Sequence, residues 1–226
     1  MAGGAIDDDG SAGHAFLVGL GADGDTLWEH PMTYSYAQTS VQGLATTGNG
    51  DLIASAFLVD CDMLLSLFLA ERIAPDGSTV WSHVFHSNDP LHGMALTAGD
   101  TIAFYSGQGV IIAGPAGDSL SFFSTNGAFV EKLVWDVGQT LMTSTWNVSL
   151  SRWSMDGAMI ASGTVAGSVV DMASWRGHRL VLSSNGMLRS LDVDLVVTDS
   201  LDLGDGYGYG KLLPVGDLLI AAGGDH

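Results

Sequence analysis

The sequence predicts an all-β repeat fold, and three observations lead to that prediction. Glycine is abundant, with 31 glycines against 5 prolines in 226 residues, which is typical of tight turns between short strands. The apolar runs are short, rich in β-branched and aromatic residues, and bounded by Gly, Asp, Asn and Ser. A glycine-centred turn motif also recurs at a regular interval along the chain.

The first anchor of the repeat is a glycine, usually followed by a polar residue and then by an apolar-rich segment. It occurs at Gly50, Gly99, Gly138, Gly177 and Gly216. The first interval is 49 residues long and the next three are 39 residues each. Three identical intervals indicate a structural repeat, and the longer first interval indicates one enlarged connection.

The second anchor keeps the same interval and is a strand that ends in a turn containing Asp-Gly or Gly. Its copies are ADGDTLW (22–28), PDGSTVW (75–81), AGDSLSF (116–122), MDGAMIA (155–161) and a degenerate DVDLVVT (192–198). Glycine suits such turns because it adopts positive φ without steric cost.

Each repeat contains four strand-like pieces, as the second copy illustrates. These are residues 67–74, 79–85, 93–98 and 101–106, which we label strands A, B, C and D of the repeat. No segment combines a helical period with capping residues. Four short antiparallel strands in about 40 residues are typical of one β-propeller blade, which must stack on its neighbours to bury both faces.

We therefore predict a five-bladed β-propeller of four-stranded antiparallel blades over residues 14–226, preceded by a flexible acidic segment, 1–13. The predicted blades are residues 14–57, 67–106, 109–146, 148–184 and 186–223. Two alternatives stay open for the five repeats, which form either a closed ring of their own or a piece of a longer propeller.

The segments PDGSTVW and ADGDTLW, followed by GDLIASAF or GDTIAFYS, resemble blades of bacterial quinoprotein-like and cell-surface propellers. The resemblance covers residues 14–223 and implies the propeller fold. The tryptophan of the motif is kept in the first two copies, as Trp28 and Trp81. No cofactor-binding residue can be carried over, and quinoprotein dehydrogenases have more blades, so we expect no cofactor.

The charge balance excludes several partners. The chain has 25 acidic and 7 basic residues, for a formal net charge of −18, and the bases do not cluster beyond Arg176 and Arg179. Nucleic acids and anionic membrane surfaces require a basic footprint, so we expect neither as a partner. The longest apolar run, 63–70, is too short to span a membrane. The single cysteine, Cys61, allows no internal disulfide.

The connections from strand B to strand C and from strand D to strand A vary between repeats, and variable loops on a rigid scaffold are where binding sites arise. Tyrosine beside Asn and Asp suits sugars, since rings stack on apolar C–H faces while amides and carboxylates bind hydroxyls. The candidate ligand-binding residues are Tyr34, Tyr36, His86, Asn88, Asp89, Asn126, Tyr207 and Tyr209. A structural role for the tyrosines, covering the blade rims, is the alternative.

Metal and catalytic sites have weaker signals. The run Asp7–Asp9 lacks the alternating ligands and final acid of a calcium loop, and Asp60 and Asp62 are weak cation candidates, so we assign no metal site. Glycosidases need two converging carboxylates, for which Glu71 and Asp192 are the candidates on strand A, taken as the innermost strand. No nucleophile-elbow or phosphate-loop motif is present. The sequence therefore favours a binding protein over an enzyme, and we assign no catalytic residue.

We conclude from the sequence that the chain is a non-enzymatic, lectin-like module that recognises carbohydrate through the variable loops of one propeller face. A structural or protein-interaction propeller, as a segment of a larger cell-surface protein, is the first alternative, and a glycoside hydrolase is the second. The expected partner is a glycan or a protein. An extracellular or cell-surface location is favoured if a leader precedes this chain.

Overall fold

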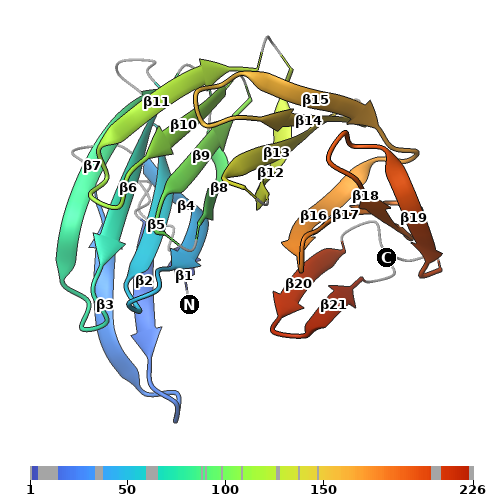
Figure 1. Ribbon diagram of the computed structural model, residues 1–226. Coiled ribbons are helices and arrows are strands. Elements are labelled where there is room, and N and C mark those ends of the chain that lie inside the picture. Colours follow the sequence, from blue (N-terminus) through green and yellow to red (C-terminus); the bar gives the residue numbers. More distant parts are fainter. Residues whose placement is uncertain are drawn as a thin grey trace. The chain divides into compact units, whose positions relative to one another are not determined.

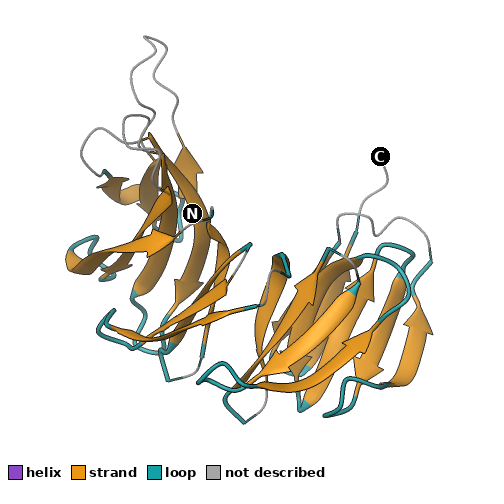
Figure 2. Cartoon of the chain, turned by 90° about the horizontal axis from the view of Figure 1, so that it is seen from above, coloured by secondary structure: helices purple, strands orange, loops and turns teal. Residues whose placement is uncertain are grey.

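The computed structural model describes residues 2–4, 15–33, 38–59, 66–87, 89, 91–97, 99–107, 109–125, 128–136, 138–146, 148–204 and 210–223. These residues form β-strands and the connections between them, with no helix in the described part of the chain (Figure 2). The described residues accordingly include no helix that is long and apolar enough to cross a membrane. The all-β prediction is confirmed.

Four sheets each contain four antiparallel strands that follow one another along the chain (Figure 1). The first contains β4 (Gln38–Thr46), β5 (Leu52–Val59), β6 (Ser66–Ile73) and β7 (Thr79–Ser87). The second contains β8 (Leu91–Leu96), β9 (Ile102–Ser106), β10 (Gly109–Ala113) and β11 (Ser119–Ser124). The third contains β12 (Val130–Asp136), β13 (Thr140–Thr145), β14 (Ser149–Trp153) and β15 (Met159–Thr164). The fourth contains β16 (Val169–Trp175), β17 (His178–Ser183), β18 (Met187–Leu191) and β19 (Val197–Asp202).

Two smaller sheets complete the described strands. One contains β1 (Ala2–Gly4), β2 (Ala15–Leu20) and β3 (Thr26–Met32), and the other contains β20 (Lys211–Val215) and β21 (Leu218–Ala222). The four-stranded antiparallel architecture is thus confirmed, whereas the number of five blades stays a prediction.

The sheets group the strands differently from the predicted blades. The predicted blade 67–106 contains β6 to β9, but β6 and β7 pair with β4 and β5, while β8 and β9 pair with β10 and β11. The repeat interval is the same wherever a repeat is cut, so periodicity alone cannot tell which connection is a hairpin and which one crosses to the next sheet. The predicted boundaries are therefore displaced by two strands.

The N-terminal segment also differs in part from the prediction of a flexible tail. Ala2–Gly4 form β1, which pairs antiparallel with Ala15–Leu17 of β2. Three backbone pairings against an existing edge strand order this short apolar and glycine segment. Residues 5–13, including Asp7–Asp9, lie outside the described residues.

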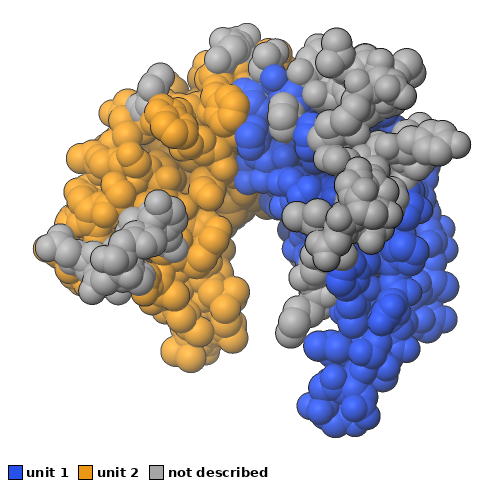
Figure 3. Space-filling model, turned by 180° about the vertical axis from the view of Figure 1, so that it is seen from behind, with its two compact units in different colours: residues 1–122 blue, residues 123–226 orange. Residues whose placement is uncertain are grey.

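The chain divides into two compact units, residues 1–122 and residues 123–226 (Figure 3). In the first unit, side chains alternate along β5, so that Leu58 packs with Leu17 and Leu69, while Ile53 packs with residues such as Phe104. The sheet that contains β5 is therefore buried on both faces by its two neighbours, as stacked repeats require.

The second unit repeats this packing. Val181 of β17 packs with Met142 and Leu191, while the adjacent Leu180 packs with Leu212 of β20 on the other face of the sheet. The first strands of successive sheets lie side by side, β4 with β8 in the first unit, and β12 with β16 and β16 with β20 in the second. The first strand is therefore the inner one, and the predicted inner strand A, which includes Glu71, is the third.

Each sheet has two chemically different ends. At one end, the first strand is joined to the second and the third strand to the fourth. We call this the turn end. The loop end is opposite, where the second and third strands are joined and the chain leaves for the next sheet. The glycines of the predicted Asp-Gly turns, Gly24, Gly77, Gly117 and Gly157, lie at the turn end, and all have φ between 81° and 90°.

Candidate functional site

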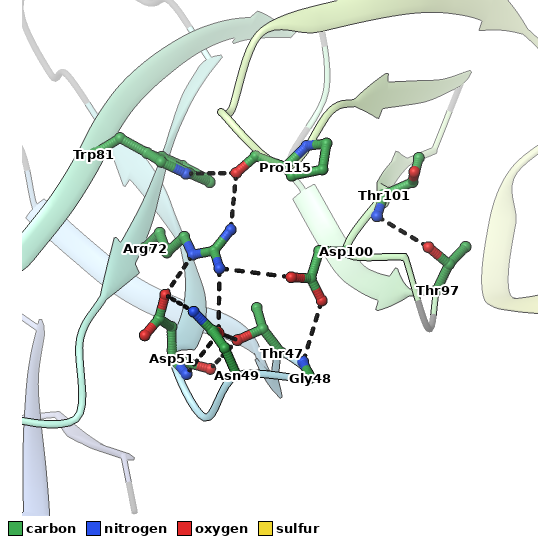
Figure 4. Close-up of polar contacts among 10 residues, drawn as sticks. All are labelled: Thr47, Gly48, Asn49, Asp51, Arg72, Trp81, Thr97, Asp100, Thr101 and Pro115. Carbon is green, nitrogen blue, oxygen red and sulfur yellow. Dashed lines mark hydrogen bonds and ion pairs between the residues drawn. The ribbon is translucent and has the colours of Figure 1, made fainter.

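The turn end is held by buried ion pairs. In the first unit the Arg72 guanidinium donates from Nε to Asp51 Oδ2 at 2.7 Å and from Nη2 to Asn49 Oδ1 at 3.2 Å (Figure 4). Its Nη1 donates to the carbonyl oxygen of Pro115 at 3.0 Å, and Asp100 Oδ2 lies 3.5 Å from Nη2. Three tight turns, at 47–51, 97–101 and 114–118, are thereby tied to one side chain.

The hydrogen bond from Arg72, followed by that from Asn49, holds the pKa of the Asp51 carboxyl below its ordinary value. A carboxyl with a lowered folded-state pKa adds stability above its unfolded pKa of about 4, and loses that contribution as the pH falls through the folded-state value. We expect Asp51→Asn to flatten the decline in stability as the pH falls below about 4. Urea-unfolding midpoints across this range test the expectation, with the exposed Asp25→Asn as a charge-matched control. Parallel curves for Asp51→Asn and the wild type would contradict it.

A second buried network holds the turn end in the other unit. Asp136 Oδ2 accepts hydrogen bonds from Arg179 Nε at 2.6 Å and from Thr140 Oγ1 at 3.2 Å, and Arg152 Nε lies 3.0 Å away. The Asp136 side chain is fully buried and that of Arg179 is 6% exposed. Arg72, Arg179 and Arg189 are all buried, so three of the seven basic residues are placed in the interior rather than on the acidic surface.

Successive sheets are also joined at the turn end by a repeated hydrogen bond. Trp28 Nε1 donates to the carbonyl of Pro75 at 2.9 Å, and Trp81 Nε1 donates to the carbonyl of Pro115 at 3.0 Å. In the second unit Arg152 Nη1 donates to the carbonyl of Val193 at 3.0 Å, at the same position of the turn. The motif tryptophans are thus structural, because each links one sheet to the next.

The two carboxylates considered for glycoside hydrolysis both make structural contacts. Glu71, 7% exposed, accepts a hydrogen bond from Ser82 Oγ at 2.9 Å on Oε1, and its Oε2 lies 2.8 Å from His30 Nε2. Asp192 Oδ1 accepts the backbone N–H groups of Asp194 and Val196, each at 2.9 Å, inside the turn before β19. Within the described ranges, no group of three or more His, Cys, Asp or Glu side chains is placed to hold a metal ion.

The predicted ligand-binding residues fall mostly outside the described part of the chain. His86 is exposed near the end of β7, opposite Leu67, and Asp89 is half-buried in the following bend. Their role in binding stays a prediction. The residues outside the described ranges are Tyr34, Tyr36, Asn88, Asn126, Tyr207 and Tyr209, together with Asp60 and Asp62.

The loop end of the second unit differs in charge from its turn end. No acidic or basic residue occurs in four of its connections, 125–129, 146–148, 165–168 and 184–186. In the fifth connection, 203–210, the one charged residue of the sequence is Asp205. The turns at the opposite end carry Asp156, Arg176, Asp192, Asp194 and Asp217. In a chain with a net charge of −18, these connections are thus almost free of charge, whereas the adjoining strand ends carry Glu131, Lys132, Asp171, Asp202 and Lys211.

The loop end of this unit also exposes two large aromatic side chains. Trp146, between β13 and β14, is 73% exposed, and Phe129, just before β12, is 45% exposed. Tryptophan is buried on average, so these two exposed rings mark this end as a candidate binding surface. Trp146 was not among the residues predicted from the sequence, because only tyrosines were considered as stacking rings. The signal available was that Trp146 occupies a connection that holds Gly107 or Ser184 in other repeats.

Comparisons with known proteins give matches in structure but not in sequence. No protein-family model and no curated protein matches the chain. A protein of unknown function from Bacteroides caccae matches with a TM-score of 0.61 and 13% identity, over 90% of this chain and 80% of that one. The WD40 domain of Neurospora crassa Pan2 matches with a TM-score of 0.65 and 11% identity, over 83% of this chain and 57% of that one. BBS1N, solved in complex with ARL6DN, matches with a TM-score of 0.67 and 11% identity, over 93% of this chain and 68% of that one.

This chain is a β-propeller repeat protein. The propeller neighbours and the stacked four-stranded antiparallel sheets agree on this point, and the resemblance to propeller blades noted in the sequence is confirmed. Identities of 11% to 13% show the fold alone, so the function of this propeller has to be argued from its own residues.

Proposed function

We propose that this propeller is a non-catalytic binding module whose loop end recognises an uncharged glycan. The observation that carries the proposal is the near absence of charge from the connections at the loop end of the second unit, which offer hydroxyls, amides and exposed aromatic rings. A sugar without charged groups is bound by those groups, through hydrogen bonds to its hydroxyls and stacking on its C–H faces. A charged ligand would instead require opposite charges at the site.

A glycan array at millimolar calcium tests this function, followed by titration of the binding glycans with the purified chain in solution. We expect neutral oligosaccharides to be retained, and retention to persist at high salt because no ion pair is involved. Asp217→Asn, which removes an exposed charge at the turn end, should bind as the wild type does. No binding above background, or binding restricted to sulfated or sialylated glycans, would contradict the proposal.

A protein-interaction propeller is the second candidate, and one repeated feature favours it. The last strand of a sheet is an edge strand, and β3, β7 and β15 each contain a β-bulge near their start. The extra residue of the bulge is Leu27, Val80 or Ile160, with 66%, 53% and 48% exposure. Exposed aliphatic side chains at this position of three edge strands would suit a protein surface, whereas β19 has the polar Thr198 there. BBS1N, a similar propeller, was solved with the protein ARL6DN bound.

Photo-crosslinking separates this candidate from the first. A benzophenone side chain at Val80 or Ile160 should capture the same protein, whereas one at the exposed Ser162 on β15 serves as the control. The captured protein, once purified, should bind the wild-type chain and bind Val80→Asp at least about tenfold more weakly. Equal affinity for the wild type and Val80→Asp would remove the bulge residues from consideration.

A further inference from the structure

Trp146 occupies the second position of a tight turn at the loop end of the second unit. The turn joins β13 to β14 and is closed by a hydrogen bond from the Val148 backbone N–H to the Thr145 carbonyl at 3.2 Å. The Val148 carbonyl in turn accepts the N–H of Val165 at 3.2 Å. Both backbone groups of Val148 are therefore fixed, and the backbone that carries Trp146 is held in place.

Phe129 directly precedes β12, the strand that pairs with β13. Strands β12 and β13 are antiparallel, and Val130 is opposite Thr145 in their register. The next residue outward on each strand is Phe129 on one and Trp146 on the other, so the two exposed aromatic residues lie at the same end of two adjacent strands. A second turn, with the Ala128 N–H bonded to the Thr125 carbonyl at 3.1 Å, directly precedes Phe129.

The equivalent turn of the next sheet shows what the repeat requires at this place. Between β17 and β18 the sequence is Ser183-Ser-Asn-Gly186, with the Gly186 N–H bonded to the Ser183 carbonyl at 3.0 Å. The Gly186 carbonyl accepts the N–H of Leu203 at 3.0 Å, just as Val148 accepts that of Val165. The two turns therefore share these two hydrogen bonds, with Ser184 in the place of Trp146 and Gly186 in the place of Val148, and the sister turn has a further bond from the Ser184 N–H to the Ser168 carbonyl at 2.9 Å.

Valine in place of glycine at the fourth position of the turn, residue 148, has a conformational cost. Gly186 has φ of +75°, which glycine adopts readily, but Val148 has φ of +60°. A β-branched residue in the left-handed region is strained. The equivalent turn between β9 and β10, at Ser106–Gly109, also ends in glycine. Strain of this kind is typically retained where a site requires it, and here it coincides with the exposed tryptophan.

We propose that Phe129 and Trp146 form an aromatic platform that binds one ring of a neutral oligosaccharide, with Val148 as a residue that positions Trp146. This inference rests on the proposed glycan-binding function and assigns a site to it. The flanking Thr145 and Ser149 are half-buried and supply hydroxyl groups without charge, whereas the Thr125 hydroxyl is buried and donates to the Ala128 carbonyl at 2.7 Å. An indole face stacks on the apolar C–H face of a sugar ring, and neutral hydroxyls satisfy its O–H groups, which makes an uncharged sugar the fitting ligand.

Fluorine NMR of the chain labelled with fluorotryptophan tests the site directly. The chain has six tryptophans, and the resonance of Trp146 is assigned by its disappearance in Trp146→Ser. Cellohexaose, laminarihexaose, xylohexaose, mannohexaose and chitohexaose serve as separate probes. We expect at least one of them to shift the Trp146 resonance in a saturable manner, and Trp146→Ser or Phe129→Ala to weaken its binding by about tenfold.

The chain offers matched controls for folding and for non-specific stacking. Trp146→Ser gives this turn the residue that the sister turn has as Ser184, so its thermal unfolding midpoint should stay close to that of the wild type. Ser184→Trp places a tryptophan in the sister turn, opposite Ser168 rather than a phenylalanine, since Val169 pairs with Ser183. In the Trp146→Ser background, Ser184→Trp should not restore binding, because a lone indole lacks the second ring.

Val148→Gly separates a positioning role from a purely structural one. Glycine relieves the strain, so we expect an unchanged or higher thermal midpoint together with a saccharide affinity reduced by about threefold to tenfold. An unchanged affinity would show that Val148 does not position Trp146.

The remaining outcomes distinguish a wrong site from a wrong function. Glycan binding that is equal in the wild type and in Trp146→Ser overturns the platform and leaves the proposed function standing. Absence of any glycan binding by the wild type overturns both. A Trp146 resonance that shifts with an uncharged proline-rich peptide, and with none of the saccharides, overturns the ligand class and assigns the platform to protein recognition.

Discussion

Replacing Asp136 by alanine is expected to lower the free energy of unfolding by about 3–5 kcal/mol. The Asp136 carboxylate is fully buried and accepts Arg179 Nε at 2.6 Å, with Arg152 Nε at 3.0 Å. Its removal leaves two guanidinium groups in the interior without their counter-charge, and such groups cannot recover their lost hydration. For a domain of this size the change corresponds to a thermal midpoint lower by on the order of 10 °C.

Asp217→Ala is the control for this prediction. Asp217 also pairs with an arginine, Arg176, but its side chain is 86% exposed and that of Arg176 is 52% exposed. An exposed ion pair contributes about 0–1 kcal/mol, so the control should unfold close to the wild type in urea. Similar losses for Asp136→Ala and Asp217→Ala would show that burial does not set the energy of these pairs.

The second large effect is expected for Gly77→Ala, in the turn between β6 and β7. Gly77 has φ of +86°, and an added Cβ would lie 2.6 Å from Cγ of Trp28. That indole is held by its hydrogen bond to Pro75, so it cannot move away without breaking the link between two sheets. We expect a loss of about 1–2 kcal/mol from the backbone and about 1–3 kcal/mol more from the collision.

Gly24→Ala isolates the backbone part of this effect. Gly24 occupies the same turn position in the preceding sheet, with φ of +90°, but nothing lies within 4 Å of its added Cβ. The difference between the two variants in urea unfolding therefore measures the packing of Trp28 against the turn. Trp28→Ala combined with Gly77→Ala should remove that difference, and an unchanged penalty in the double variant would place the strain elsewhere.

The turns of the fold could be predicted from the sequence because each has a local chemical cause. The tight turns at Gly24, Gly77, Gly117 and Gly157 require positive φ, and glycine beside Asp, Ser or Pro marks such a turn in the sequence itself. The grouping of strands into sheets has no such local mark. The connection 107–108 inside a sheet and the connection 88–90 between two sheets are both short and polar, and the choice between them depends on long-range packing.

The candidate site was less predictable than the fold. Tyrosine, Asn and Asp pointed to the variable connections, yet Trp146 and Phe129 were missed because neither belongs to a recognised motif. Comparing equivalent turns would have singled out the pair Trp146 and Val148, where the other repeats have small residues and glycine. That comparison needs the sheet boundaries, which periodicity alone placed two strands away.

The hydrogen bonds of Trp28 and Trp81 also make two junctions between sheets of the first unit visible to spectroscopy. Each indole spans one junction of the first unit, from an edge strand to the carbonyl of Pro75 or Pro115, and Trp175 makes a similar bond to Gly216 in the second unit. Separation of two sheets breaks one such hydrogen bond and exposes one indole ring to water. The fluorescence of single-tryptophan variants therefore reports the unfolding of a stacked array junction by junction, without any added dye.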